Sequence, residues 1–377
     1  MKISYITNYD SQDIHSWSGT GYKIAQSLQQ QNNEIDFISN LKYKANLSIV
    51  LKYGFNKIFK NSYDRFREPY VVKQYAKQIL ERLKPDADVL FSPGTLPISL
   101  LDSKKPKVFY TDATFVGMLD FYPAFTGLSR ESIRIGNYLD QCALDSSTLA
   151  IFSSEWAAQT AIDFYSADPK KIQVIPFGAN LSSKKSFQEI QHIISKRSKI
   201  ECNILFMAVQ WNRKGGELAL NIVRKLNILG LKTNLHIVGF KKLPIEKIPE
   251  YVINHGYISK STKEGLDKIE NLLSKCHFLL LPTQADCTPI VYSEANSFGL
   301  PCISTNVGGI PTIIKDEING KLFSLNDNLD VYAAYIYAVF CNEKRYTDLC
   351  KSSFNEFQTR LNWDVAGSSI MKLLNQI

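Results

Sequence analysis

The sequence predicts an α/β protein made of two successive doubly wound domains, whose parallel sheets face each other across a cleft. Short apolar or β-branched runs alternate with amphipathic stretches, which is typical of parallel strands connected by helices. This alternation is interrupted by the polar, lysine-rich stretch 182–199 and then begins again. The chain of 377 residues also exceeds the length that one ordinary hydrophobic core supports, so two domains are expected.

In the first half, six runs rich in apolar and β-branched residues are expected to form strands. These runs are 2–7, 34–39, 88–91, 107–111, 148–152 and 172–175. Residues 19–31 carry Ile24, Ala25 and Leu28 at helical spacing, so a helix is expected between the first two strands. The first domain is predicted to occupy residues 1–180.

The second half repeats the alternation of strands and helices. Strands are expected at 203–209, 234–238, 278–281 and 301–305, and helices at 217–229, 264–273 and 289–298. Another helix is expected within 182–199, and a last one at 363–374. The second domain is predicted to span residues 181–358, and residues 359–377 to form a C-terminal helix that can pack back on the first domain.

The composition argues against several classes of protein. The N-terminal residues lack the apolar segment of a secretory signal, and no apolar run reaches the roughly 18–20 residues that cross a bilayer. Seven cysteines and five histidines show no metal-binding spacing, which indicates thiols in a reducing compartment. We therefore expect a cytoplasmic protein without metal or cofactor, either soluble or peripheral on the inner face of a membrane.

The net charge of +8 is concentrated between Leu41 and Pro85. The cations there are Lys42, Lys44, Lys52, Lys57, Lys60, Arg65, Arg67, Lys73, Lys77, Arg82 and Lys84, against the acids Asp64, Glu68 and Glu81. Eight aromatic residues lie among them: Tyr43, Tyr53, Phe55, Phe59, Tyr63, Phe66, Tyr70 and Tyr75. We expect a pair of helices that packs most of these aromatics on the core. The cations either are simply solvated or bind an anionic membrane surface or a charged glycan, with nucleic acid less favoured.

The segment from Asp286 to Glu294 carries two acids at the start of a predicted helix. Thr288 is expected to be the N-cap, Pro289 the first helical residue, and Gly299 the end of the helix. Amides at such a helix start suit an anion, and carboxylates accept hydrogen bonds from sugar hydroxyls. The alternative is an acidic loop followed by a solvated helix face.

A second motif, from Trp211 to Gly216, follows the strand that ends at Val209. Arg213 offers a planar fork of donors and Lys214 a point charge, and the two glycines allow a diphosphate to approach closely. An ordinary basic turn is the alternative for this motif taken alone.

Together the two motifs resemble those of the GT4 glycosyltransferases, retaining enzymes that use nucleotide sugars and have the GT-B fold of two Rossmann-like domains. In that family a Glu-x7-Glu motif occupies the place of Asp286 and Glu294, and a Lys-Gly pair the place of Lys214 and Gly215. The resemblance implies that Asp286 binds hydroxyls of the transferred sugar, that Glu294 binds the ribose, and that Arg213 and Lys214 bind the diphosphate. Asp286 is one methylene shorter than the family's Glu, which leaves the sugar open. Other donor contacts are expected from Cys287, Thr288, Pro289, Ile290 and Tyr257.

Three further segments extend the resemblance over nearly the whole chain. Residues 306–311 are similar to the family's Gly-Gly-x-Pro-Glu loop, although Thr312 replaces the Glu. Residues 174–180 are similar to the Pro-x-Gly segment that ends the first domain. Gly19 and Gly21 match the N-terminal glycine loop that closes over the phosphates.

The chain also departs from the family pattern in its first domain. The family often has a His after a central strand, where this chain has Asp112, which either takes that role or caps the following turn. His15 is a weaker substitute. The family's Arg a few residues before the Lys-Gly pair is Val209 here, so Arg213 is expected to supply that charge. Asp86 and Asp88 match the Asp-x-Asp of metal-dependent enzymes, but they precede a strand rather than follow one, which argues against a metal site.

The resemblance implies transfer of a sugar from a nucleotide-diphosphate sugar to a hydroxyl of a glycan, a lipid-linked acceptor or a protein. It also implies retention of configuration. The transfer is expected to need no metal, because cations and helix amides can neutralise the leaving diphosphate. Two alternatives remain: a non-catalytic subunit that binds sugar nucleotides, and a nucleotide-sugar epimerase of similar architecture.

Overall fold

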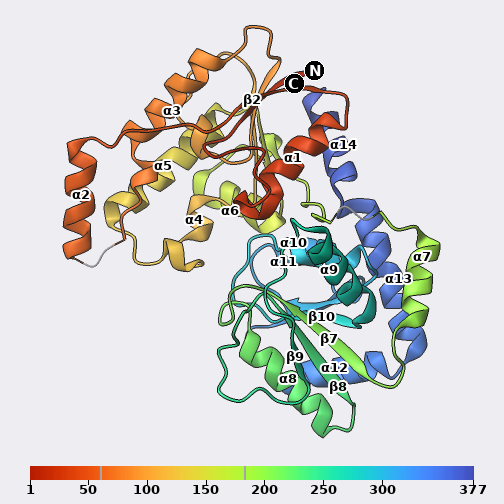
Figure 1. Ribbon diagram of the computed structural model, residues 1–377. Helices are drawn as coiled ribbons and strands as arrows, with labels where there is room; N and C mark the ends of the chain where they lie inside the picture. The colour runs from red at the N-terminus through yellow and green to blue at the C-terminus, as the bar shows by residue number, and fades with distance from the viewer. Residues whose placement is uncertain (60–61, 182–183) are drawn as a thin grey trace. The chain divides into compact units, whose positions relative to one another are not determined.

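The computed structural model describes residues 1–59, 62–181 and 184–377. Lys60 of the basic stretch and the first two residues of the polar stretch 182–199 lie outside the described residues. The chain divides into an N-terminal unit, Met1–Pro176 with Ala366–Ile377, and a C-terminal unit, Phe177–Val365 (Figure 1).

The N-terminal unit contains one six-stranded parallel sheet in the order β2-β1-β3-β4-β5-β6. Its strands are β1 Lys2–Ile6, β2 Glu34–Ile38, β3 Val89–Ser92, β4 Lys107–Thr111, β5 Leu149–Phe152 and β6 Ile172–Val174. All six confirm the predicted runs, to within one or two residues at each end. Four of the strands are wholly or almost wholly buried, because helices cover the sheet, and this explains their nearly continuous apolar sequences.

The helices of the N-terminal unit begin, in several cases, at residues whose side chains cap the helix. They are α1 Thr20–Gln29, α2 Leu47–Ile58, α3 Pro69–Arg82, α4 Phe115–Met118, α5 Arg130–Ser146 and α6 Glu155–Tyr165, with α14 Trp363–Leu374 belonging to this unit from Ala366 onward. Asn46, Ser129 and Ser154 each accept a backbone N–H at the start of a helix. The predicted pair of helices in the basic stretch is therefore confirmed as α2 and α3.

The C-terminal unit contains a second six-stranded parallel sheet, in the order β12-β11-β10-β7-β8-β9. Its strands are β7 Cys202–Met207, β8 Thr233–Val238, β9 Val252–Asn254, β10 Phe278–Leu281, β11 Cys302–Thr305 and β12 Gly320–Phe323. The two edge strands, β9 and β12, were not predicted. Both are short and only partly buried, so neither presents an apolar run in the sequence.

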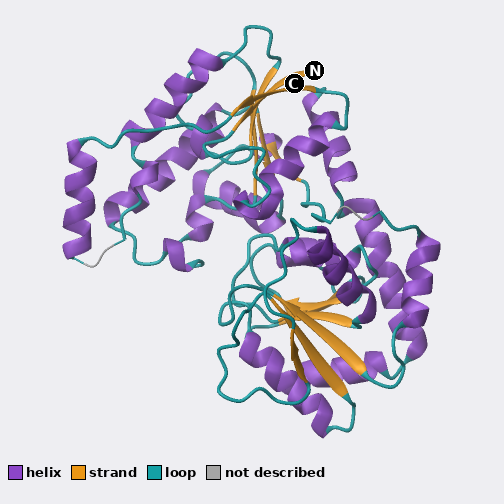
Figure 2. Cartoon of the chain, in the orientation of Figure 1, coloured by secondary structure: helices purple, strands orange, loops and turns teal. Residues whose placement is uncertain are grey.

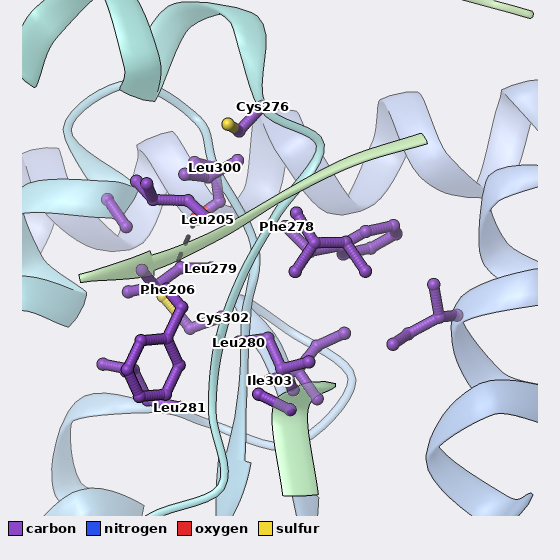
Figure 3. Close-up of a cluster of buried hydrophobic side chains, with 14 of the residues drawn as sticks. Leu205, Phe206, Cys276, Phe278, Leu279, Leu280, Leu281, Leu300, Cys302 and Ile303 are labelled. Carbon is purple, nitrogen blue, oxygen red and sulfur yellow. Dashed lines mark hydrogen bonds between the residues drawn. The ribbon is translucent and has the colours of Figure 1, made fainter. Parts of the chain in front are cut away.

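Helices α7 Phe187–Lys196, α8 Gly216–Ile228, α9 Lys263–Lys275, α10 Ile290–Asn296, α11 Ile310–Ile313, α12 Leu329–Phe340 and α13 Glu343–Arg360 flank this second sheet (Figure 2). The core between them is built on the central strands. Phe206, Phe278 and Ile303 are fully buried there, among side chains from β7, β10 and β11 (Figure 3). None of the helices in the described parts of the chain has the length and hydropathy of a membrane span.

Candidate functional site

Arg213, Lys214 and Asp286 meet at the carboxyl edge of the C-terminal sheet. The two cations follow β7 and the acid follows β10, and these strands are neighbours in the sheet. Arg213 Nη1 lies 3.3 Å from Asp286 Oδ2, and Lys214 Nζ forms an ion pair with the same oxygen. All three side chains are at most 17% exposed. The two predicted motifs therefore form one cluster with a surplus of positive charge.

The two glycines beside this cluster allow close packing within the protein, which the sequence did not reveal. Gly215 has φ +74°, and a β-carbon there would lie 2.1 Å from the carbonyl oxygen of Pro282; one at Gly216 would lie 2.2 Å from the Trp211 ring. The amides of both glycines donate to carbonyls of the same loop, those of Asn212 and Trp211. The close approach that these glycines permit is thus to the protein's own backbone and indole, which fixes the cations at the sheet edge.

Backbone hydrogen bonds join the loops around Asp286. The amide of Gln284 donates to the Arg213 carbonyl at 2.8 Å, which ties the loop after β10 to the loop after β7. The amide of Gly309 donates to the Asp286 carbonyl at 3.1 Å. The glycine-rich loop 306–311, singled out in the sequence, therefore borders the same cluster.

Glu294 is fully buried inside α10, so the interpretation of this helix face as solvated is wrong. Its two carboxylate oxygens lie 2.6 and 2.5 Å from Lys260 Nζ. Lys260 lies in the loop between β9 and α9, which also carries the exposed Tyr257. Sequence reasoning missed Lys260, because a single lysine in a polar loop matches no motif.

The start of α10 differs from the prediction. The helix begins at Ile290, and Pro289 rather than Thr288 holds the N-cap position. The Thr288 hydroxyl donates to the Cys287 carbonyl at 2.7 Å instead of capping the helix. Thr288 and Cys287 are both buried at this turn. The left-handed Gly299 ends the turn after α10, in the place that the sequence predicted.

The other predicted site residues belong to the N-terminal unit. Gly19, at φ +79°, is the N-cap of α1, and the Gly21 carbonyl accepts a hydrogen bond of 2.6 Å from the Tyr5 hydroxyl. Asp112 lies half-buried between β4 and α4, where Thr114 provides the side-chain cap of α4. His15 is exposed in the loop before α1.

Asp86 and Asp88 lie at the amino edge of the N-terminal sheet, opposite the edge that carries the carboxyl ends of its strands. Asp86 Oδ2 is 2.5 Å from Lys2 Nζ, and Asp88 accepts the Lys2 backbone N–H at 2.7 Å. Both acids thus stabilise the start of β1 and β3, at the amino edge, whereas ligands of such sheets bind at the carboxyl edge.

A polar cavity of about 130 Å³ opens at the carboxyl ends of β1, β3 and β4 in the N-terminal unit. Asp140 lines it, and its carboxylate accepts hydrogen bonds of 2.6 Å from the Thr95 hydroxyl and the Phe115 amide. Burial raises the pKa of Asp140, against these hydrogen bonds, which lower it. Tyr9 and Ser92 also line the cavity, and their hydroxyl oxygens are buried without a hydrogen-bond partner within the described ranges. Such a cavity suits an occupant with hydroxyl groups.

Comparison with known proteins places these observations in a family context. Residues 187–355, somewhat less than half of the chain, match the family model of glycosyl transferases group 1. The chain is 27% identical over 213 residues to the UDP-Gal:alpha-D-GlcNAc-diphosphoundecaprenol alpha-1,3-galactosyltransferase of Escherichia coli, covering 54% of each chain. It is 25% identical over 235 residues to an uncharacterized 41.2 kDa protein in the cps region of Klebsiella pneumoniae, covering 60% of each. The alignments thus span about half to three fifths of these relatives.

Solved structures match the fold over the whole chain. Sucrose-phosphate synthase from Thermosynechococcus elongatus superposes with a TM-score of 0.70 at 14% identity, covering 100% of this chain and 98% of that one. Anabaena Alr3699/HepE, solved in complex with UDP and glucose, gives a TM-score of 0.64 at 14% identity, with both chains fully covered. The fold is therefore GT-B, and the expected resemblance to GT-B glycosyltransferases is confirmed.

Proposed function

We propose that this protein is a glycosyltransferase that moves a sugar from a nucleotide-diphosphate sugar to an acceptor hydroxyl. The observation that carries the proposal is the convergence of Arg213 and Lys214 on Asp286 at the carboxyl edge of the C-terminal sheet. Cations, a carboxylate and the buried Glu294 lie in the part of the chain that matches the group 1 glycosyl transferases. Diphosphate, sugar and ribose each require groups of this kind.

The cluster suggests how a donor enters the site. Asp286 Oδ2 is shared by both cations, so the carboxylate is their counter-ion. A diphosphate carries more negative charge and can replace Asp286 as the partner of Arg213 and Lys214. The carboxylate is then released to accept hydrogen bonds from hydroxyls of the sugar, which is the role proposed for it here.

The transfer step uses the same two cations. The acceptor oxygen forms a bond to the anomeric carbon while the bond from that carbon to the diphosphate oxygen breaks, and the diphosphate leaves with the electron pair. Arg213 and Lys214 stabilise the charge that grows on the departing diphosphate, and the acceptor proton passes to the leaving phosphate. The family resemblance supports retention of configuration. Metal independence is part of the proposal, because the two side chains supply positive charge where a metal ion would.

Glu294 is proposed to bind the ribose hydroxyls of the donor. Because Lys260 Nζ contacts both of its oxygens, a ribose can reach Glu294 only if this ion pair opens. Lys260 is 40% exposed on a loop, so its side chain can turn away when ribose hydroxyls replace it at Glu294, and it can then contact the nucleotide itself. We propose Lys260 as an additional donor-binding residue.

The acceptor is proposed to bind on the N-terminal unit, at the polar cavity lined by Asp140. Its polar lining, with Asp140 and Thr95 joined by a hydrogen bond, is suited to hydroxyls of a glycan or of a lipid-linked sugar. A cytoplasmic location is also part of the proposal, supported by seven cysteines that are all free thiols.

A thermal-shift screen with UDP-, GDP-, ADP- and dTDP-sugars tests the donor, since a ligand that binds the folded state raises its melting temperature. Turnover assays with the best donor, with and without candidate acceptors, then follow. Release of nucleoside diphosphate that depends on an acceptor is expected. Donor conversion without an acceptor would indicate an epimerase, and tight binding with no turnover a non-catalytic subunit. No stabilisation by any sugar nucleotide would contradict the proposal.

A further inference from the structure

Helix α2 turns its apolar side toward solvent. Leu47, Val50, Leu51, Phe55 and Ile58 follow the three- and four-residue spacing of one helix face, and each is between 56% and 77% exposed. Most amphipathic helices bury such a stripe against the core. In Figure 1 the helix lies at the outer edge of the N-terminal unit, which agrees with this exposure.

The polar side of α2 faces the protein instead. Lys52 Nζ lies 3.0 Å from Glu68 and 2.7 Å from Glu131, so a lysine expected on the surface forms an inward ion pair. Asn56 is buried and donates to the Lys52 carbonyl, and Ile49 is the one core residue of the helix. These contacts hold α2 in an orientation that leaves its apolar stripe uncovered within the N-terminal unit.

Aromatic and cationic side chains extend this exposed stripe. The prediction that most aromatics of the basic stretch pack on the core is wrong, because five of the eight are exposed: Tyr53, Phe55, Phe59, Phe66 and Tyr70. The Arg65 guanidinium lies over the Tyr53 and Phe66 rings, at 5.7 and 5.1 Å from their centroids. Lys57 of α2 is exposed as well, and so is Lys44, three residues before the helix begins.

The exposed charged residues next to the stripe are mostly cations. Only two acids occur between residues 41 and 70, Asp64 and Glu68, and Glu131 of α5 is a third acid next to α2, paired with Lys52. Asp64 pairs with Arg67, and Glu68 is buried against Lys52. An exposed apolar stripe bordered by cations complements a surface that is apolar inside and negative outside.

We propose that the α2 surface, made of the stripe from Leu47 to Ile58 with Phe59, Phe66, Lys44, Lys57 and Arg65, docks on an anionic lipid bilayer. The apolar side chains enter the boundary between headgroups and acyl chains, and the cations contact lipid phosphates. A second copy of the chain is a poorer partner, because a symmetric contact through this face brings like charges together.

Co-sedimentation of the full chain with vesicles tests this inference without any measurement of activity. We expect binding to phosphatidylcholine vesicles that contain 30% phosphatidylglycerol, little binding to pure phosphatidylcholine, and a strong loss of binding as salt is raised. The stripe variant Leu51→Asp/Ile58→Asp and the charge variant Lys57→Glu/Arg65→Glu should each lower the vesicle-bound fraction at least tenfold. Lys52 is left unchanged, because its replacement would break the ion pairs that hold the helix.

The matched control is Ile200→Asp/Ile228→Asp, which changes two apolar residues of the C-terminal unit that are 85% and 74% exposed, and it should bind as the parent does. Circular dichroism and melting curves verify that every variant is folded. Absence of binding to anionic vesicles at low salt would overturn the proposal, as would equal binding to neutral vesicles or unchanged binding of both α2 variants. Self-association that the stripe variant abolishes, in the absence of vesicle binding, would instead assign the surface to a second copy. The sugar-transfer proposal is unaffected by any of these outcomes.

Discussion

Replacement of Asp286 by Asn tests whether this carboxylate is a counter-ion that the donor diphosphate displaces. In the structure one carboxylate oxygen is shared by Arg213 and Lys214, and all three side chains are largely buried. The variant keeps the shape of the side chain but replaces its negative charge, next to the two cations, with a neutral amide. If the diphosphate replaces Asp286 as their partner, the variant should bind a nucleoside diphosphate more tightly than the parent does.

The size of the effect follows from the interactions that are lost. A hydrogen bond to a charged group contributes roughly 1.5–3 kcal/mol, so the variant's C-terminal unit should be destabilised by about that amount without ligand. For a unit of this size, this corresponds to a fall in melting temperature of roughly 3–12 °C. A bound diphosphate restores negative charge next to both cations. The affinity should therefore rise by about tenfold, and by at most about 150-fold if the whole loss is recovered.

Calorimetric titration with the nucleoside diphosphate of the best donor measures this affinity, and melting curves with and without it measure the stability. Sugar transfer should fall strongly in the same variant, since the hydroxyls of the sugar lose their acceptor. Glu217→Gln, which removes an exposed acid from the first turn of α8, is the matched control and should change the affinity little. An Asp286→Asn variant that is folded but binds the nucleoside diphosphate no better than the parent would refute the exchange of counter-ions.

Three further outcomes are expected. Lys214→Ala should weaken nucleoside diphosphate binding by about tenfold to 150-fold in a folded protein, because a charge partner worth roughly 1.5–3 kcal/mol is lost; an unchanged affinity in calorimetry would contradict its role. Activity should survive EDTA, whereas loss that Mn²⁺ or Mg²⁺ restores would show that a metal is required. Burial lowers the pKa of His236 and His277 to about 4, so the unfolded chain takes up protons first as the pH falls. The contribution of these two histidines to the free energy of unfolding should thus decrease as the pH falls through about 6.5 toward 4, and urea titrations at pH 7, 6 and 5 that show no decrease would contradict this.

Part of the site could be found from the sequence because its residues lie at the ends of strands. Arg213, Lys214 and Asp286 follow buried apolar runs that the sequence reveals, and parallel strands bring their carboxyl ends to one edge of a sheet. The contact of Lys260 with Glu294 could not be found in this way. It joins a polar loop to a helix 34 residues further along, and no local pattern encodes such a pairing.

The sequence by itself determined the fold class, the two parallel sheets and all but the two edge strands, because burial on both faces of a sheet leaves continuous apolar runs. It also indicated a pair of helices in the basic stretch, the first of which is α2. Only the tertiary structure decided which side of that helix faces solvent. The ion pairs of Lys52 with Glu68 and Glu131 turn the polar side inward, and they depend on residues far away in the chain. Periodicity shows that a helix has an apolar side, but the partners across the fold decide what that side meets.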